Sequence, residues 1–233
     1  AGLLAMRTSE LYPLTDRRHP TFWHGTREGF AYARRNRTVL VILSMMVVFS
    51  SVSFNFNIIL PLLAKTTLAA GPGTFGIISA CFGAGALVGA LSAAAMANAR
   101  WRVMFLGAGG FGLCELVLAP LHTVGPAGVL LFVCGVFFTS YTANSNSAIQ
   151  LASADYIRGR VLGLYYYAWN GLAPFGALLV GYMCDHGGTE LAFYVGGTSA
   201  LAVTLLGAVA VRRPPRRAPA RVEAEPAGEQ LAA

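Results

Sequence analysis

Residues 37–65 read RTVLVILSMMVVFSSVSFNFNIILPLLAK, so that 27 residues without charge separate Arg37 from Lys65. A helix that crosses a bilayer needs about 20 predominantly apolar residues at a rise of 1.5 Å each. Backbone polar groups inside hydrocarbon must be satisfied within the segment, which favours a helix over an open strand. The stretch therefore predicts a membrane-spanning helix over residues 39–63.

Five further apolar runs follow along the chain. They cover residues 75–96, 103–121, 129–149, 161–184 and 191–211, and the only charged residue in any of them is Glu115. The composition is 55% hydrophobic and 12% charged, whereas about 25% charged residues are typical of soluble domains. The runs are too long for barrel strands and lack their period of two. We therefore expect an all-α polytopic membrane protein with six transmembrane helices.

The basic residues predict the orientation of these helices. Of the 17 basic residues, 16 lie in the first 37 residues, in two connections between runs, and in the last 22 residues; only Lys65 falls on the other side. Because basic residues concentrate in cytoplasmic segments, both termini are expected in the cytoplasm, with the chain multi-pass in the cell inner membrane. The formal net charge of +7 then reflects topology. This distribution of positive charge indicates that the partner is the lipid bilayer. A nucleic-acid partner is not expected.

Three segments of different composition are evident. Residues 1–37 are polar and arginine-rich, and they predict a cytoplasmic connector with a short amphipathic helix. Residues 38–211 form the predicted bundle. Residues 212–233 are rich in Arg, Pro, Ala and Glu, and they predict a disordered cytoplasmic tail. The chain begins with Ala1 and an apolar hexapeptide, from which we expect a missing upstream part.

Polar side chains within the spans are the first candidates for a functional site. In lipid, an unsatisfied polar group costs several kcal/mol, so each needs water, a ligand or another helix. Hydrogen bonds between helices and the lining of a pathway both remain open. Pro61 predicts a bend where the first polar stripe ends. The candidates for a substrate cavity are Asn55, Asn57, Tyr141, Asn144, Tyr166 and Asn170.

Glu115 is the sole acid inside a span. An intramembrane carboxyl group is a candidate for proton or cation handling, and the alternative is a protonated, hydrogen-bonded structural acid. The four cysteines lie in or at the end of spans without close metal-ligand spacing, so we expect free thiols packed as small apolar groups. No metal site, cofactor or catalytic residue is expected.

Two motifs carry a family resemblance. The runs RGRVLGLY at residues 158–165 and GLAPFGALLVG at residues 171–181 resemble a loop and the eleventh helix of major facilitator superfamily transporters of the enterobactin-exporter-like branch. The run EGFAYARRN at residues 28–36 is similar to the segment before their seventh helix. The resemblance covers about residues 25–211. Because these transporters have twelve helices in two halves, the chain resembles the C-terminal half.

The resemblance implies a secondary-active exporter of a small amphipathic compound, working by alternating access and coupled to protons. Its partners would be the small-molecule substrate, protons, and a missing N-terminal half or a second copy. The first and fourth spans would face the cavity, while the third and sixth would lie outermost, which weighs against Glu115 as the coupling residue. Arg158 and Arg160 would belong to a cytoplasmic gate, or serve only as topology determinants.

Two other functions remain as alternatives. A self-contained six-helix protein could work as a homodimer. A rhomboid-like intramembrane protease would need a serine in a GxSG-like turn and a histidine at membrane depth. The nearest sequence, GTSA at residues 197–200, lacks the last glycine, and His122 and His186 lie at the outer edges of spans. An enzyme is therefore not expected.

Overall fold

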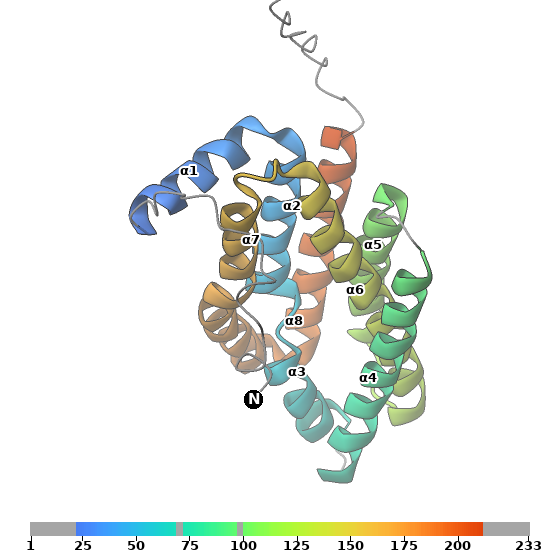
Figure 1. Ribbon diagram of the computed structural model, residues 1–233. Coiled ribbons are helices and arrows are strands. Elements are labelled where there is room, and N and C mark those ends of the chain that lie inside the picture. The colour runs from blue at the N-terminus through green and yellow to red at the C-terminus, as the bar shows by residue number, and fades with distance from the viewer. Residues whose placement is uncertain (1–21, 69–71, 97–99, 212–233) are drawn as a thin grey trace, which may run out of the picture.

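The computed structural model describes residues 22–68, 72–96 and 100–211. All regular elements in these residues are helical (Figure 1). The first part of the predicted connector and the predicted disordered tail lie outside the described residues. The elements in chain order are α1 (Phe22–Arg35), α2 (Arg37–Val48), the π-helical η3 (Phe49–Ser53), α3 (Phe56–Leu62), the π-helical η4 (Leu63–Thr67), α4 (Pro72–Ala95), α5 (Trp101–Leu118), α6 (Val124–Ala152), α7 (Arg158–Tyr166), the π-helical η5 (Tyr167–Gly171) and α8 (Ala173–Val211).

The described helices confirm a polytopic membrane fold. Five stretches are long and apolar enough to cross a bilayer: Arg37–Thr67, Gly73–Ala95, Trp101–Leu118, Val124–Ala152 and Arg158–Val211. The last has 54 residues, more than twice the length of about 20 that one crossing needs. Its backbone leaves helical geometry at Gly187 and at Gly188, where φ is 67°. That positive φ favours glycine, and the turn allows two crossings.

The first span is not one continuous helix. Its backbone leaves the helix between η3 and α3, at Phe54 (φ −91°, ψ 73°) and Asn55 (φ −121°, ψ 42°). The sequence predicted a bend at Pro61, which lies inside α3, whereas this interruption comes six residues earlier. Asn side chains compete with backbone hydrogen bonds, and Asn55 Nδ2 donates to the backbone carbonyl of Ser50 here.

Close backbone contact joins α4 to α6. A Cβ atom placed on Gly85 would lie 1.9 Å from the carbonyl oxygen of Phe132, and one on Gly135 would lie 2.2 Å from that of Phe82. In lipid the hydrophobic effect does not drive helices together, so helices associate through close van der Waals packing. Small residues permit that close approach. Gly89 makes a similar contact with Val136. The α4 and α6 helices therefore form a pair whose spacing is set by glycine.

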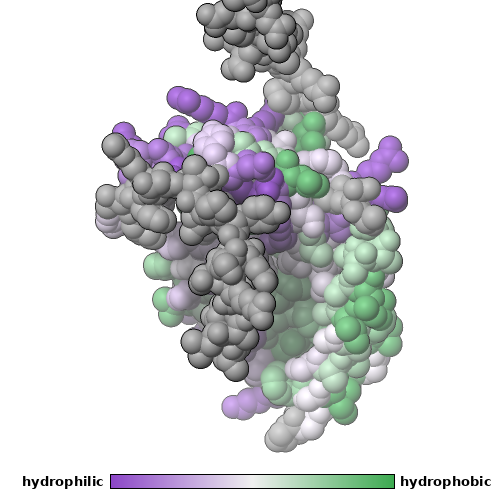
Figure 2. Space-filling model, viewed as in Figure 1, coloured by the Kyte–Doolittle hydropathy of each residue, from purple (hydrophilic) through white to green (hydrophobic). Residues whose placement is uncertain are grey.

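Polar groups gather at the two ends of the bundle. One end, which we call the arginine-rich end, carries α1, the last residues of α4, the first residues of α5 and the α6–α7 connection, and hydrophilic side chains gather there in Figure 2. At the opposite end, Thr67 Oγ1 lies 2.6 Å from Thr189 Oγ1. His122 Nε2 lies 3.5 Å from Glu190 Oε1 at the same end. These contacts agree with spans of alternating direction.

Candidate functional site

The interruption of the first span is held by hydrogen bonds of its own. The Phe54 N–H donates to the carbonyl of Phe49 (2.7 Å), one residue further back than in an α-helix. Asn55 Nδ2 donates to the carbonyl of Ser50 (3.3 Å). We call residues 49–55 the helix break. π-helical turns are frequent at functional sites, so the break is a candidate position for a functional site.

A second π-helical segment, η5, meets the helix break. Ser50 Oγ donates to the carbonyl oxygen of Trp169 in η5 (2.6 Å). Gly176, at the start of α8, packs against the break so closely that a Cβ atom would lie 2.7 Å from the carbonyl oxygen of Ser51. Two irregular segments, about 120 residues apart in the sequence, therefore support each other at one place.

Four half-buried aromatic side chains lie beside this junction: Phe54, Phe82, Phe138 and Trp169, which we call the aromatic patch. The rings of Phe54 and Phe138 stack with centroids 3.9 Å apart and planes 7° from parallel. Trp169 lies 5.1 Å from Phe54, and Phe82 lies 5.9 Å from Phe138. The patch combines side chains of the helix break, α4, α6 and η5. The four side chains are only partly buried, and aromatic rings stack favourably against other flat groups.

Buried aromatic side chains support the patch from inside the bundle. They are Phe49, Phe56, Phe111, Tyr141 and Phe193. The ring of Phe49 stacks on that of Tyr141 with centroids 4.5 Å apart, and the rings of Phe56 and Phe111 stack at 5.6 Å. This packing restricts the side-chain conformations of the half-buried rings of the patch.

Three of the predicted cavity residues are buried inside the bundle. Asn55 lies in the helix break, and Tyr141 is 0% exposed. The Tyr141 hydroxyl has no hydrogen-bond partner among the described residues. Asn144 accepts a hydrogen bond from the backbone N–H of Arg100 (3.1 Å), just before α5. Asn144 thus ties α6 to the start of α5, which is the interhelical role left open by the sequence.

The other three predicted cavity residues are exposed. Asn146 Nδ2 donates to the hydroxyl of Tyr166 (3.2 Å), which links α6 to α7. Asn170 Nδ2 donates to the backbone carbonyl of Tyr166 (3.2 Å). Asn57 is exposed in α3, just after the helix break. The structure therefore divides the six candidates between the interior and the surface, and it does not bring them into one cluster.

Glu115 points into the bundle although α5 was expected to lie outermost. Its side chain is 1% exposed, and neither carboxyl oxygen has a hydrogen-bond partner in the part of the chain that the structure describes. A Cβ atom on Gly196 of α8 would lie 3.2 Å from both oxygens. Ser53, in the helix break, donates to the carbonyl of Gly196 (2.8 Å). Glu115 thus lies behind the break, next to the thiols of Cys114 and Cys134.

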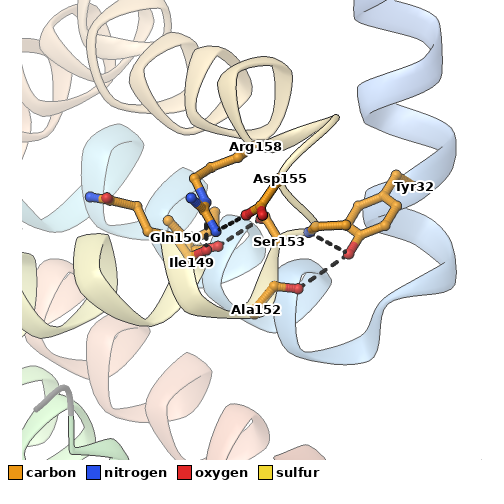
Figure 3. Close-up of polar contacts among 8 residues, drawn as sticks. Tyr32, Ile149, Gln150, Ala152, Ser153, Asp155 and Arg158 are labelled. Atoms are coloured by element: carbon orange, nitrogen blue, oxygen red, sulfur yellow. Dashed lines mark hydrogen bonds and ion pairs between the residues drawn. The ribbon is translucent and has the colours of Figure 1, made fainter. Parts of the chain in front are cut away.

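Arg158 and Arg160 bind acidic partners within this chain. Arg158 Nη2 lies 2.5 Å from Asp155 Oδ1, and Arg158 Nε donates to the carbonyl of Gln150 (3.1 Å; Figure 3). Arg160 forms an ion pair with Glu28 of α1. Both sets of contacts lie at the arginine-rich end and connect neighbouring segments. They do not test the predicted gate, which stays a prediction.

The same end holds α1 against the α6–α7 connection. The Tyr32 hydroxyl donates to the carbonyl of Ala152 (3.2 Å) and accepts from the N–H of Ala154 (3.3 Å; Figure 3). Asn36 Nδ2 donates to the same Ala152 carbonyl (3.0 Å), while its Oδ1 accepts from two N–H groups of α2. One side chain therefore caps α2 and anchors the connection.

Sequence reasoning identified the polar residues and missed the aromatic patch. Phe54 and Trp169 each precede a predicted candidate by one residue, and that adjacency was the available signal. Phe82 stands in an apolar stretch, where a ring that faces lipid has the same sequence context as a ring that faces a site. Phe138 directly precedes the polar stretch that begins at Thr139. Among the described residues, no group of three or more His, Cys, Asp or Glu side chains could hold a metal ion.

Comparison with known proteins gives the family. The model of the transmembrane secretion effector family matches residues 7–231. The multidrug efflux pump Tap of Mycobacterium tuberculosis is 33% identical over 135 residues, which are 57% of this chain and 32% of the pump. The pump of the same name from Mycobacterium bovis matches with the same values.

These shares have a consequence for length. Because the same aligned segment is a larger part of this chain than of the pumps, the chain spans little more than half the length of the relatives that it matches. No solved structure matches the chain. The family and the relatives point to a transporter and away from an enzyme. The chain belongs to the transmembrane secretion effector family of major facilitator superfamily transporters.

Proposed function

We propose that this chain forms the C-terminal half of a secondary-active exporter that moves small amphipathic compounds out of the cell by alternating access. The observation that carries the proposal is the aromatic patch beside an interrupted span. Transporters bind substrate near the middle of the bilayer, at helices that are discontinuous there. The family match, and relatives named multidrug efflux pumps, support export. The length relation to those pumps supports a missing N-terminal half.

The aromatic patch and the exposed polar side chains near it would share the substrate. Phe54, Phe138 and Trp169 offer flat apolar surface. Asn170 follows Trp169 directly and Asn57 lies three residues after Phe54, so both would add hydrogen-bonding groups near the rings. A pocket with an apolar lining and a few polar groups suits amphipathic ligands.

The orientation and the branch also belong to this proposal. The arginine-rich end would face the cytoplasm of the inner membrane, by the positive-inside rule, and Arg158 and Arg160 would then belong to a gate on that side. The RGRV run at residues 158–161 supports the enterobactin-exporter-like branch. A homodimer of this chain is the alternative to a transporter with two different halves.

Transport by the complete transporter and by the isolated chain tests the function. Inverted membrane vesicles with an acidic interior are given ethidium, a planar amphipathic cation, and its uptake is followed by fluorescence. We expect uptake with the complete transporter and none with the isolated chain. Equal uptake by the isolated chain would favour the homodimer. No gradient-driven uptake of ethidium or of other amphipathic dyes by either form would contradict the proposal.

Glu115 is our proposed proton-binding group. Its carboxyl group is buried between α5, α8 and the helix break, so a change in its charge would act on the one span that is already interrupted. A buried charge without a partner is costly, which links protonation to the position of the break. The titratable groups beside it are the thiols of Cys114 and Cys134.

We expect Glu115→Gln to abolish proton-driven uptake while substrate exchange across vesicles without a gradient continues. Glutamine keeps the size of the side chain but cannot carry the proton. Glu190→Gln is the matched control, because Glu190 is half-exposed just after the turn inside α8, beside His122. Loss of exchange together with uptake in Glu115→Gln would assign Glu115 a structural role instead. Unchanged proton-driven uptake would remove it from coupling.

A further inference from the structure

Helix α1 has two faces of different chemistry. Trp23, Arg27, Phe30 and Arg34 are spaced by four, three and four residues, so they share one face of the helix. All four are exposed, Trp23 by 77% and Phe30 by 57%. The sole acidic residue of α1, Glu28, lies off this face and binds Arg160. We call the face formed by these four residues the outer face of α1.

The opposite face of α1 is packed on α7. A Cβ atom on Gly29 would lie 3.3 Å from the side chain of Leu164, and one on Gly25 would lie 3.6 Å from Arg160 Nε. Ala33 on this side is 2% exposed. The contacts of Tyr32 and the Glu28–Arg160 ion pair add to this docking. The rotation of α1 about its axis is therefore fixed, and the outer face points away from the bundle.

The position of α1 relative to the first span is also fixed. Only Asn36 separates α1 from α2, the beginning of the first span, and Asn36 caps α2. A helix of 14 residues is about 21 Å long, so all of α1 lies within about that distance of the beginning of the span. In Figure 1, α1 extends sideways from the arginine-rich end, at an angle to the spans.

The side chains of the outer face fit one kind of partner. Trp and Phe are suited to the boundary between headgroups and acyl chains. Arginine offers a fork of N–H donors that matches phosphate, and Arg35 and Arg37 add exposed positive charge next to the face. Anionic phospholipids of the adjacent leaflet provide both the phosphate and the net negative charge.

We propose that the outer face of α1 binds the headgroups of anionic phospholipids in the leaflet on the arginine-rich side. Binding there would hold α1 level with the membrane surface and, through Arg160, the beginning of α7. The proposal depends on the chain spanning a membrane and not on which substrate is transported.

Short-range quenching of Trp23 by lipid tests the proposal. The full chain carries Trp101→Phe and Trp169→Phe, which leaves Trp23 as the single tryptophan. It is reconstituted in phosphatidylcholine vesicles with equal amounts of either brominated phosphatidylglycerol or brominated phosphatidylcholine. We expect stronger quenching by the brominated phosphatidylglycerol. The relative association of the two lipids should shift about fivefold toward phosphatidylcholine for each arginine neutralised in Arg27→Gln and Arg34→Gln.

Arg102→Gln is the matched control, because Arg102 is an exposed arginine of α5 at the same end of the bundle but far from α1 in sequence. It should leave the lipid preference of Trp23 unchanged. Equal quenching by the two lipids in the chain with both arginines would overturn the proposal. Weak quenching by both lipids would also overturn it and would indicate that protein, such as another half of the transporter, covers the face. Circular dichroism of each variant shows that the helices are retained.

Discussion

Gly85→Ala is expected to lower the melting temperature of the purified chain by about 10 °C. The added methyl group would fall 1.9 Å from the carbonyl oxygen of Phe132, so the backbones of α4 and α6 must separate. Overpacking costs about 1–3 kcal/mol when side chains can yield, and here the obstacle is backbone. For 150–250 residues, each kcal/mol corresponds to about 2–4 °C. Thermal unfolding in detergent, followed by size-exclusion chromatography, measures the change.

Gly83→Ala provides the control on the same helix. A Cβ atom at Gly83 meets nothing within 4 Å, and alanine favours a helix over glycine by about 1 kcal/mol. Its melting temperature should therefore stay the same or rise. Gly135→Ala, which approaches the same contact from α6 at 2.2 Å from the Phe82 carbonyl, should behave like Gly85→Ala. If Gly85→Ala and Gly83→Ala melt together, α4 and α6 do not approach this closely.

The sequence predicted the spans where charges mark their limits. The predicted runs at 75–96, 103–121 and 129–149 correspond to α4, α5 and α6 within a few residues. The turn inside α8 follows Asp185 and His186, and it consists of two glycines. Placing a charged group in hydrocarbon costs more free energy than local conformational preferences can offset. The positions of the charged residues therefore determine where the chain crosses the membrane.

The interior of the spans was harder to predict. The break at Phe54 and Asn55 is held by a hydrogen bond from Asn55 to Ser50 within the break and by one from Ser50 to Trp169 in η5. Local sequence pointed instead to Pro61. Spans that are apolar all round carry no periodic pattern to show which face looks inward, so neither the inward direction of Glu115 nor the assembly of the aromatic patch could be derived.

Phe138→Ala is expected to raise ethidium accumulation in cells that express the complete transporter nearly to the level of cells without it. Phe138 stacks on Phe54 at 3.9 Å and lies 5.8 Å from Trp169, so its removal opens the centre of the aromatic patch. An aromatic pair contributes about 0.5–1.5 kcal/mol beyond burial, and loss of the ring area adds to it. Binding of a planar substrate should therefore weaken by at least about tenfold.

Phe132→Ala separates a substrate effect from a general effect of removing a ring. Phe132 lies on the same helix, its side chain is 36% exposed, and it is outside the aromatic patch. This variant should keep ethidium accumulation low. Phe138→Trp should also keep it low, because a ring remains at the centre of the patch. If Phe138→Ala, with an unchanged melting temperature, pumps ethidium as well as Phe132→Ala does, substrate does not bind at the patch, and the exposed polar residues Asn57 and Asn170 become the next positions to substitute.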